Sequence, residues 1–246
     1  MTASLFFAEQ VPNVVGAIAY ITGTEAHHGV TVRRLRLGEQ VYVADGAGSA
    51  VLGAVVAISK TQVAVSAAQV FSQVARSPHR WVAVQALPKG ERAELAIEML
   101  SELGVSEIVA WQAARSVSRW SEKIEKGVAK WRSTAREAAK QSRRFQVPQV
   151  SYATTAQLVE RIQSASIALI CHQDATAWVE SVTLPATGDV VFIVGPEGGI
   201  SENELTAFQA AGAVPVRIAT HVLRTSTAGA VMLSELQSLL RRSANV

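Results

Sequence analysis

The stretch at residues 190–230 reads VVFIVGPEGGISENELTAFQAAGAVPVRIATHVLRTSTAGA, and the interpretation of the whole chain starts from it. Its apolar run at 190–194 lies between Gly188 and Gly195 and predicts a buried strand. The sequence GPEGG at 195–199 follows at once. Its three glycines allow positive φ and let a ligand approach the backbone closely. The pattern therefore predicts a strand that ends in a glycine-rich loop.

A helix is predicted directly after this loop. Ser201 and Glu204 fit the S-x-x-E capping box that opens many helices. The helical pattern continues to about residue 211 and stops before Gly212, a residue type favoured just past a helix end. The next strand is expected at 214–219.

A polar loop at 219–227 and a closing helix at 228–241 complete the stretch. The loops at 195–200 and 219–227 thus leave the same ends of two strands, with a helix between them. Ligands of open α/β sheets bind in the crevice at that end. The two loops are therefore predicted to form a binding site, although glycine-rich turns of this kind also occur without a ligand.

Two common nucleotide sites do not fit the glycine-rich loop. No Gly-Lys-Ser/Thr ends it, as a Walker A loop requires, and it lacks the G-x-G-x-x-G spacing of dinucleotide sites. No acidic residue ends the following strand to hold a ribose. A ligand held like a dinucleotide or a nucleoside triphosphate is therefore not expected.

Composition points to a globular chain of one large or two small domains. Its 246 residues are 49% hydrophobic and 17% charged, which is enough apolar material for a sizeable core. No apolar run is long enough for a membrane span, and the N-terminus lacks a secretory signal. Cys171 is the one cysteine, so neither an intrachain disulfide nor a cysteine zinc site is expected. We expect a cytoplasmic protein without a membrane partner.

Positive charge is concentrated at residues 115–144. This segment holds ten Lys or Arg against three Glu, a net +7 in a chain whose net charge is +3. A helix predicted at 121–144 places apolar residues on one face: Ile124, Val128, Trp131, Ala135 and Ala138. Basic residues lie away from it: Lys126, Lys130, Arg136, Lys140 and Arg144. The block indicates a polyanion such as RNA, with a solvated helix face as the alternative.

The N-terminal part alternates short β-type runs with turns and shows no helical period of useful length. Strands are expected at 14–22, 40–44, 50–59 and 63–67, with a turn at Asp45-Gly46. These runs predict a small β-barrel domain. A linker is expected at 68–80, and the domain boundaries are placed at 1–72 and 73–246.

From residue 81 the pattern changes to strands alternating with helices. Strands are predicted at 81–86, 107–111, 167–171, 190–194 and 214–219. Helical patterns lie between them at 91–103, 121–144, 155–164 and 201–211. This alternation predicts an α/β domain with a mostly parallel sheet and helices on both faces.

Several motifs together resemble the RsmE family. GPEGGISENEL is followed some twenty residues later by HVLRTSTAG, and this pair is specific. Weaker pieces occur in the family's order, namely HHGVTVRRLRLGE at 27–39, LPKGER at 87–92, SELGV at 101–105, ARSV at 114–117 and EAAKQSRR at 137–144. The resemblance covers nearly the whole chain.

The resemblance implies a fold and a function. RsmE proteins are SPOUT-superfamily methyltransferases that use S-adenosylmethionine (SAM) to methylate N3 of a uridine in 16S rRNA of the small ribosomal subunit. It implies a trefoil-knotted SPOUT domain, a PUA-like barrel that holds RNA, and a homodimer. No metal and no DNA are expected. A SPOUT enzyme for tRNA or another rRNA position, or a non-catalytic ribosome assembly factor, remain the alternatives.

The resemblance also places the site on numbered residues. The cofactor is expected among three loops, at Leu87, Pro88, Gly195, Pro196, Glu197, Gly198, Gly199, Ile218, Val222, Leu223, Thr227 and Ala228. RNA is expected at Arg34, Arg36, Lys89, Arg115, Arg136, Lys140 and Arg144.

Two residues are predicted to take part in catalysis. Uracil N3 carries a proton at neutral pH, so its methylation requires a base or stabilisation of the uracil anion. Arg224 is expected to stabilise that anion or to hold the adjacent phosphate. Glu197 is a candidate base, although a structural role in the loop is slightly favoured. The chain departs from the family's usual residues at Met99, Ala114, Ser226 and 219–221, and Ser226 removes a carboxylate.

Overall fold

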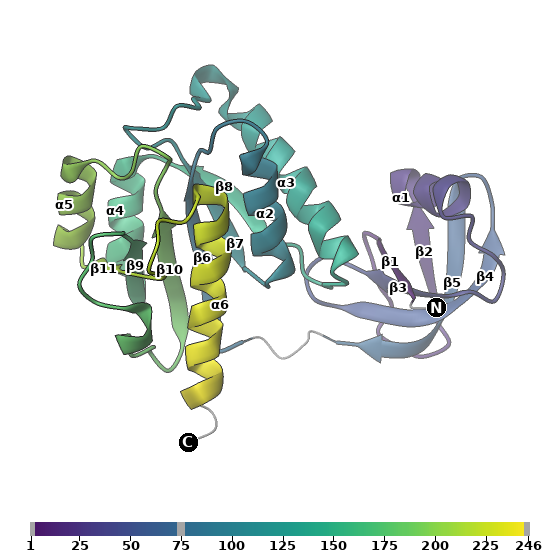
Figure 1. Ribbon diagram of the computed structural model, residues 1–246. Coiled ribbons are helices and arrows are strands. Elements are labelled where there is room, and N and C mark those ends of the chain that lie inside the picture. The colour runs from purple at the N-terminus through teal and green to yellow at the C-terminus, as the bar shows by residue number, and fades with distance from the viewer. Residues whose placement is uncertain (1–2, 73–76, 244–246) are drawn as a thin grey trace. The chain divides into compact units, whose positions relative to one another are not determined.

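The computed structural model describes residues 3–72 and 77–243, which form two compact units (Figure 1). The N-terminal unit comprises Met1–Arg76 and Ala139–Val147, and the C-terminal unit comprises Ser77–Ala138 and Pro148–Val246. The expected boundary at 72/73 adjoins residues 73–76, which lie outside the described residues, and it stays a prediction. The expected linker at 68–80 is interrupted, because strands extend into both of its ends.

The N-terminal unit is built on a five-stranded sheet of order β1-β3-β4-β5-β2. Its strands are β1 (Ser4–Phe7), β2 (Ile18–Thr22), β3 (Gln40–Ala44), β4 (Ala50–Ile58) and β5 (Gln62–Phe71). β1 pairs parallel with β3, and the other neighbours are antiparallel. Fully buried Phe6, Ile21, Val43 and Val65 contribute to its core.

Several parts of this unit differ from the sequence prediction. The strand predicted at 14–22 begins only at Ile18, and the strand predicted at 63–67 extends to Phe71. β1 was missed, and two short helices occupy a region where none was expected: α1 (Gly23–His27) and a π-helix (His28–Val32). Each helix has five residues, which is too short for a hydrophobic period to show in the sequence. The predicted strands at 40–44 and 50–59 are confirmed within one residue.

Residues 139–147 join the N-terminal unit through backbone and aromatic contacts. Val147 N donates to Gly46 O at 2.9 Å, and Gly48 N donates to Phe145 O at 3.2 Å. The Phe145 ring lies 5.5 Å from Tyr42 and 5.4 Å from Phe71, measured between centroids. These contacts attach a distant segment of sequence to the turn between β3 and β4.

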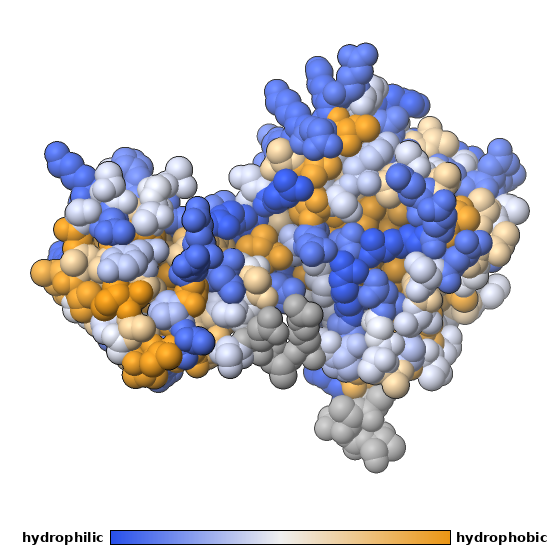
Figure 2. Space-filling view, turned by 180° about the vertical axis from the view of Figure 1, so that it is seen from behind, coloured by the Kyte–Doolittle hydropathy of each residue, from blue (hydrophilic) through white to orange (hydrophobic). Residues whose placement is uncertain are grey.

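Apolar side chains reach the surface of the N-terminal unit. Figure 2 shows them gathered in several places on this unit. Val14, Val15, Tyr20 and Val56 are among its exposed large apolar residues. The unit therefore presents apolar as well as charged surface.

The C-terminal unit is built on a six-stranded sheet of order β11-β9-β10-β6-β7-β8. Its strands are β6 (His79–Ala86), β7 (Glu107–Trp111), β8 (Gln149–Ala153), β9 (Ile167–Cys171), β10 (Gly188–Val194) and β11 (Val214–Val216). Every neighbouring pair is parallel. The parallel α/β prediction is confirmed. β8 was missed because its sequence, QVSYA, is short and half polar.

Helices cover both faces of this sheet (Figure 1). One face packs against α2 (Arg92–Glu102), α3 (Ile124–Gln141) and α6 (Thr225–Ser243). The other packs against α4 (Thr155–Ser164) and α5 (Glu202–Ala210). Successive residues of β10 point to opposite faces, so Phe192 joins the first core while Val191 and Ile193 join the second.

The basic helix has the predicted apolar face but different ends. Val128, Trp131, Ala135 and Ala138 are buried as expected. A short 3₁₀ turn at Ser121–Lys123 precedes α3, and the helix ends at Gln141 rather than at residue 144. Arg144 therefore lies outside the helix, a correction to its predicted place on the basic face.

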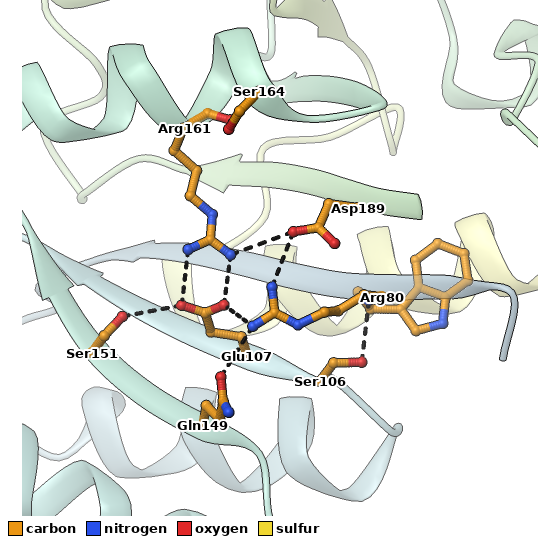
Figure 3. A network of polar contacts seen from close by, with 9 residues as sticks. Arg80, Ser106, Glu107, Gln149, Ser151, Arg161, Ser164 and Asp189 are labelled. Carbon is orange, nitrogen blue, oxygen red and sulfur yellow. Dashed lines mark hydrogen bonds and ion pairs between the residues drawn. The ribbon is translucent and has the colours of Figure 1, made fainter. Parts of the chain in front are cut away.

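A charged network holds the amino-terminal ends of the strands together (Figure 3). Glu107 is 4% exposed and binds Arg161 through both carboxylate oxygens, at 3.1 and 2.6 Å. It also accepts hydrogen bonds from Arg80 at 2.5 Å and from Ser151 at 3.2 Å. Arg80 reaches Asp189 of β10 at 3.0 Å. The network thus links four strands with α4.

The opposite edge carries the loops that follow the strands. Because all strands are parallel, their carboxyl ends lie at this single edge. The predicted trefoil knot of the chain through these loops stays a prediction.

Candidate active site

A cavity of about 560 Å³ lies at the carboxyl edge of the C-terminal sheet. Its walls come mainly from the loops that follow β9, β10 and β11. Arg92 from α2 and Arg115 from the loop after β7 complete the lining. The volume falls within the range of small-molecule sites, and the position is the one expected for ligands of open parallel sheets.

The glycine-rich loop lines this cavity and is closely packed against neighbouring residues. Gly199 N donates to Pro196 O at 2.9 Å, and Gly199 has a φ of +73°, which favours glycine. A Cβ on Gly195 would lie 2.8 Å from Ile200 Cγ1, and one on Gly198 would lie 3.1 Å from Arg115 Cβ. The loop therefore requires glycine at these positions for its turn and its packing.

Glu197 fastens the glycine-rich loop to the loop after β6. Its Oε1 accepts a hydrogen bond from the backbone N–H of Lys89 at 3.0 Å. The two residues are far apart in sequence, and the bond ties the glycine-rich loop, which lines the cavity, to a loop whose residues 87–90 lie outside the lining. This contact fits the structural role that was slightly favoured for Glu197.

Thr225 joins a third segment to the same loop. Its Oγ1 donates to Gly195 O at 2.7 Å and accepts from Gln85 Nε2 at 3.0 Å. Thr225 is 5% exposed and Gln85 is fully buried. The last residues of β6 and β10 and the first turn of α6 are thereby connected through two side chains.

Glu204 connects the site to the loop after β7. The predicted capping box is confirmed, because Ser201 accepts from Glu204 N while Glu204 Oε2 accepts from Ser201 N at 3.0 Å. The other carboxylate oxygen, Oε1, accepts from Ala114 N at 2.7 Å. The residue before Arg115 is therefore tied to the start of α5, which places Arg115 beside the glycine-rich loop.

The structure brings together most of the residues predicted to hold the cofactor. Nine of the twelve line the cavity: Gly195, Pro196, Glu197, Gly198, Gly199, Ile218, Val222, Leu223 and Ala228. Leu87, Pro88 and Thr227 lie outside the lining, and Leu87 is 1% exposed. Pro88 instead uses its carbonyl to accept from Ser118 Oγ at 2.8 Å.

The loop after β11 exposes backbone groups to the cavity. Within the described part of the chain, the amide groups of Ile218, Val222 and Leu223 make no internal hydrogen bond. Strand pairing stops at Val216, whose carbonyl accepts from His172 N, and α6 does not begin until Thr225. Donors and acceptors therefore remain here for a ligand with polar edges.

The lining residues that were not foreseen include four with ionisable side chains: Arg92, His172, Asp174 and Arg217. His172 and Asp174 directly follow β9, so their place after a predicted strand was the available signal. Arg217 donates through Nε to Gln173 O at 3.1 Å and lies 5.4 Å from the centre of the Trp178 ring. Arginine outnumbers carboxylate in the lining, which favours an anionic ligand or substrate.

Arg224 offers a charged side chain to the cavity, whereas the thiol of Cys171 stays neutral. Arg224 is exposed, lines the cavity, and has no side-chain partner among the described residues. Its carbonyl accepts from Thr227 N and Ala228 N, so α6 starts three residues earlier than predicted. Burial raises the pKa of the Cys171 thiol to about 12, which keeps the sulfur protonated at neutral pH.

The residues predicted to bind RNA lie in different surroundings. Arg34 and Arg36 are exposed in the N-terminal unit, and Lys89 and Arg115 are exposed beside the cavity. Arg136 is half-buried. Lys140 is 13% exposed and pairs with Glu25 at 3.0 Å. Burial lowers the pKa of half-buried Arg144 to about 10, so it keeps its charge at neutral pH.

Among the residues that depart from the family's usual sequence, some line the cavity and Ser226 is buried. His221 and Ala219 line the cavity. Ser226 is 1% exposed, and its hydroxyl has no hydrogen-bond partner in the described structure. A side chain buried in this way does not reach a substrate in the cavity.

Comparison with known proteins identifies the family. The RNA methyltransferase domain model matches residues 75–237, and the RNA methyltransferase PUA domain model matches residues 21–67. Ribosomal RNA small subunit methyltransferase E of Mycobacterium bovis is 40% identical over 98% of this chain and 94% of the relative. The chain belongs to the ribosomal RNA small subunit methyltransferase E family. The resemblance to RsmE is thereby confirmed.

Two other similar proteins agree with this assignment. The Bacillus subtilis enzyme is 29% identical over 88% of both chains. A Legionella pneumophila methyltransferase, solved with bound SAM, is 29% identical with a TM-score of 0.84 over 97% of this chain and 98% of the other. The PUA-like and parallel α/β predictions are confirmed, and the protein is an RNA methyltransferase.

The described residues contain neither a metal-binding cluster nor a membrane-spanning helix. In residues 3–72 and 77–243, no group of three His, Cys, Asp or Glu side chains is placed to hold a metal ion. Among the same residues, no helix combines the length and apolar character needed to cross a bilayer.

Proposed function

We propose that the protein methylates N3 of a specific uridine in 16S rRNA of the small ribosomal subunit, with SAM as the methyl donor. The cavity at the carboxyl edge carries this proposal, because Glu197 and Thr225 connect the glycine-rich loop in its lining to the loop after β6 and to the start of α6. The Mycobacterium bovis relative is a small-subunit rRNA methyltransferase by name, and the Legionella pneumophila relative binds SAM.

The residues present fit SAM. The free backbone groups at Ile218, Val222 and Leu223 suit the polar edge of an adenine, and the apolar side chains there suit its faces. The glycine-rich loop brings backbone groups to the lining of the cavity. SAM, when bound, supplies a methyl group activated on a positively charged sulfur.

The chain's own task is to position the acceptor and to handle the N3 proton. Positioning of reacting groups and exclusion of water contribute much of such a barrier reduction. We propose that Arg224 stabilises negative charge on the uracil oxygens, because its exposed guanidinium lines the cavity without a competing partner. The target uridine must be unpaired, since N3 lies within the Watson–Crick edge.

We assign Glu197 a structural role in the proposed reaction. Its hydrogen bond to the Lys89 backbone orders two loops of the site. As an ionised acceptor it makes a stronger bond than a neutral amide would. Glu197→Gln should therefore weaken cofactor affinity more than it alters the pH dependence of turnover.

The remaining parts of the proposal concern RNA and assembly. We propose that residues 1–72 bind RNA, that residues 73–246 carry the reaction, and that the protein acts as a cytoplasmic homodimer. Exposed Arg34 and Arg36 of the N-terminal unit and exposed Lys89 and Arg115 near the cavity supply the positive charge for RNA. Light scattering tests the dimer, and a monomer that still turns over would contradict it.

The test is methylation of small ribosomal subunits that lack this modification. Purified protein and SAM are added, and the rRNA is read by reverse transcription, which stops at a uridine methylated on N3. One new stop at a uridine is expected. SAM binding without a stop would indicate another RNA or atom, and neither binding nor a stop would indicate an assembly factor without catalysis.

A further inference from the structure

A second cavity, of about 230 Å³, lies wholly within the N-terminal unit and has no part in the proposed methylation site. It is lined by residues from β1, from the π-helix, and from the end of α3. Those with polar side chains are Ser4, His28, Arg33, Lys140, Gln141 and Arg143. Three segments that are distant in sequence thus meet around one basic hollow.

The charge of this hollow comes chiefly from two arginines. Lys140 is paired with Glu25 at 3.0 Å, so its charge is largely balanced. Arg33 donates through Nη2 to the neutral Ser4 hydroxyl at 2.6 Å, which fixes its side chain without cancelling its charge. Arg143 is exposed and lines the same hollow. The cavity therefore retains a net positive charge.

Arginine occupies two left-handed backbone positions in this region. Arg34 has a φ of +53° and Arg143 a φ of +56°. Each follows the end of a helix: Leu35 N donates to Gly29 O across Arg34, and Arg144 N donates to Ala139 O across Arg143. Glycine is the residue that favours this position, and another residue type costs on the order of 1 kcal/mol there.

Arg143 adopts the left-handed conformation shortly after α3 ends, and it lines the hollow that Arg33 also lines. His28, the first residue of a π-helix, a rare element that is often found at functional sites, lines the same hollow. Guanidinium groups bind phosphate oxygens in a forked geometry that lysine cannot reproduce.

We propose that this hollow binds a phosphodiester group of the RNA substrate, with Arg33 and Arg143 on its oxygens. The inference rests on the proposed RNA substrate and adds an anchoring point for its backbone. A phosphate contact positions the RNA without reading its sequence. It should therefore affect affinity for RNA and leave the methyl-transfer step unchanged at saturating RNA.

The principal test variant is Arg143→Gly in the full-length protein. Glycine suits the backbone conformation, so the fold should be retained while the charge is lost. Loss of one phosphate contact should weaken 16S rRNA binding about fivefold at about 0.15 M salt and lower the salt slope by about one ion. The double variant R33A/R143G should bind about 20-fold more weakly.

Two control variants separate a phosphate contact from general electrostatics. Lys60→Gly removes one exposed charge from the turn between β4 and β5, outside the hollow, and should change RNA affinity less than twofold. Arg143→Lys keeps the charge without the fork and should recover part of the affinity. Binding is measured by filter retention across a KCl series, with SAM affinity measured in parallel.

The outcomes distinguish this site from the proposed function. RNA affinity unchanged in both R143G and R33A/R143G would overturn the site, even if wild type methylates the rRNA. Weakened RNA binding with no methylation by wild type would uphold the site and overturn the proposed function. If inorganic phosphate binds wild type but not R143G while RNA affinity is equal, the hollow serves free phosphate and the RNA assignment is wrong.

Discussion

Replacement of Thr225 by valine tests whether the connection between strands β6 and β10 and helix α6 maintains the methylation site. Valine matches threonine in shape but removes the hydroxyl, so no cavity is created. The Gly195 carbonyl loses its donor at 2.7 Å, and Gln85 Nε2 loses its acceptor at 3.0 Å. Gln85 Nε2 keeps a second acceptor, the Ala86 carbonyl at 3.0 Å.

The expected loss in free energy of unfolding follows from the two hydrogen bonds that Thr225→Val removes. A buried group left without a hydrogen bond costs about 1–3 kcal/mol, and Gly195 is only half-buried. The expected loss in free energy of unfolding is therefore about 2 kcal/mol, or about 4–8 °C in Tm for a unit of this size. Release of the glycine-rich loop should also weaken SAM binding roughly tenfold, which corresponds to about 1.4 kcal/mol.

Tryptophan fluorescence measures the stability of the relevant unit alone. All five tryptophans lie in the C-terminal unit, at Trp81, Trp111, Trp120, Trp131 and Trp178. Unfolding followed at these residues, with SAM titration by calorimetry, gives both quantities. Thr225→Ser keeps the hydroxyl and should remain within about 1 kcal/mol of wild type. If Thr225→Val matched wild type in both assays, the connection would have no energetic role.

Three further changes test other parts of the structure. Glu107→Ala leaves Asp189 as the one carboxylate that pairs with Arg80 and Arg161 among the described residues, with Gln149 still accepting from Arg80. It should cost about 3 kcal/mol in fluorescence-detected unfolding. Asp189→Asn, at a half-buried side chain, should cost under about 1 kcal/mol, and equal effects would contradict the network of Figure 3. Arg224→Ala should lower turnover by about 100-fold or more with SAM affinity nearly unchanged, and a large loss of SAM affinity would make Arg224 a cofactor residue. Desolvation raises the pKa of half-buried Cys171 to about 12 from 9.0, so native protein should react slowly with thiol reagents at about pH 8. Its stability should fall as pH rises from about 9 toward 12, and labelling as fast as in denaturant would contradict the raised pKa.

The C-terminal strands were predictable where their sequences were apolar and bounded by turns. Residues 107–111 and 167–171 form strands with the predicted ends, because both runs are buried on two faces of a parallel sheet. β8 is half polar and lies beyond β7 at the edge of the sheet, so its sequence carries no such run. The five-residue helices of the N-terminal unit were missed for a related reason, since they are shorter than two turns.

The sequence predicted the loops that line the site but not the hydrogen bonds that join these loops to distant segments. Glycines at 195–199 and the LRT sequence at 223–225 marked two walls, because their residue types restrict backbone and ligand geometry locally. The hydrogen bond from Lys89 to Glu197 joins residues separated by 108 positions. No periodicity or spacing encodes such a pair, since it depends on β6 and β10 being neighbours in the sheet.

The basic segment shows the same division. By itself the sequence determined that α3 is amphipathic and that positive charge gathers around it, because helical period and charge are local properties. Tertiary structure alone decided that Lys140 is paired with Glu25 while Arg143 faces a hollow shared with Arg33. The physical reason is that burial, ion pairing and cavity formation depend on which distant segments pack together.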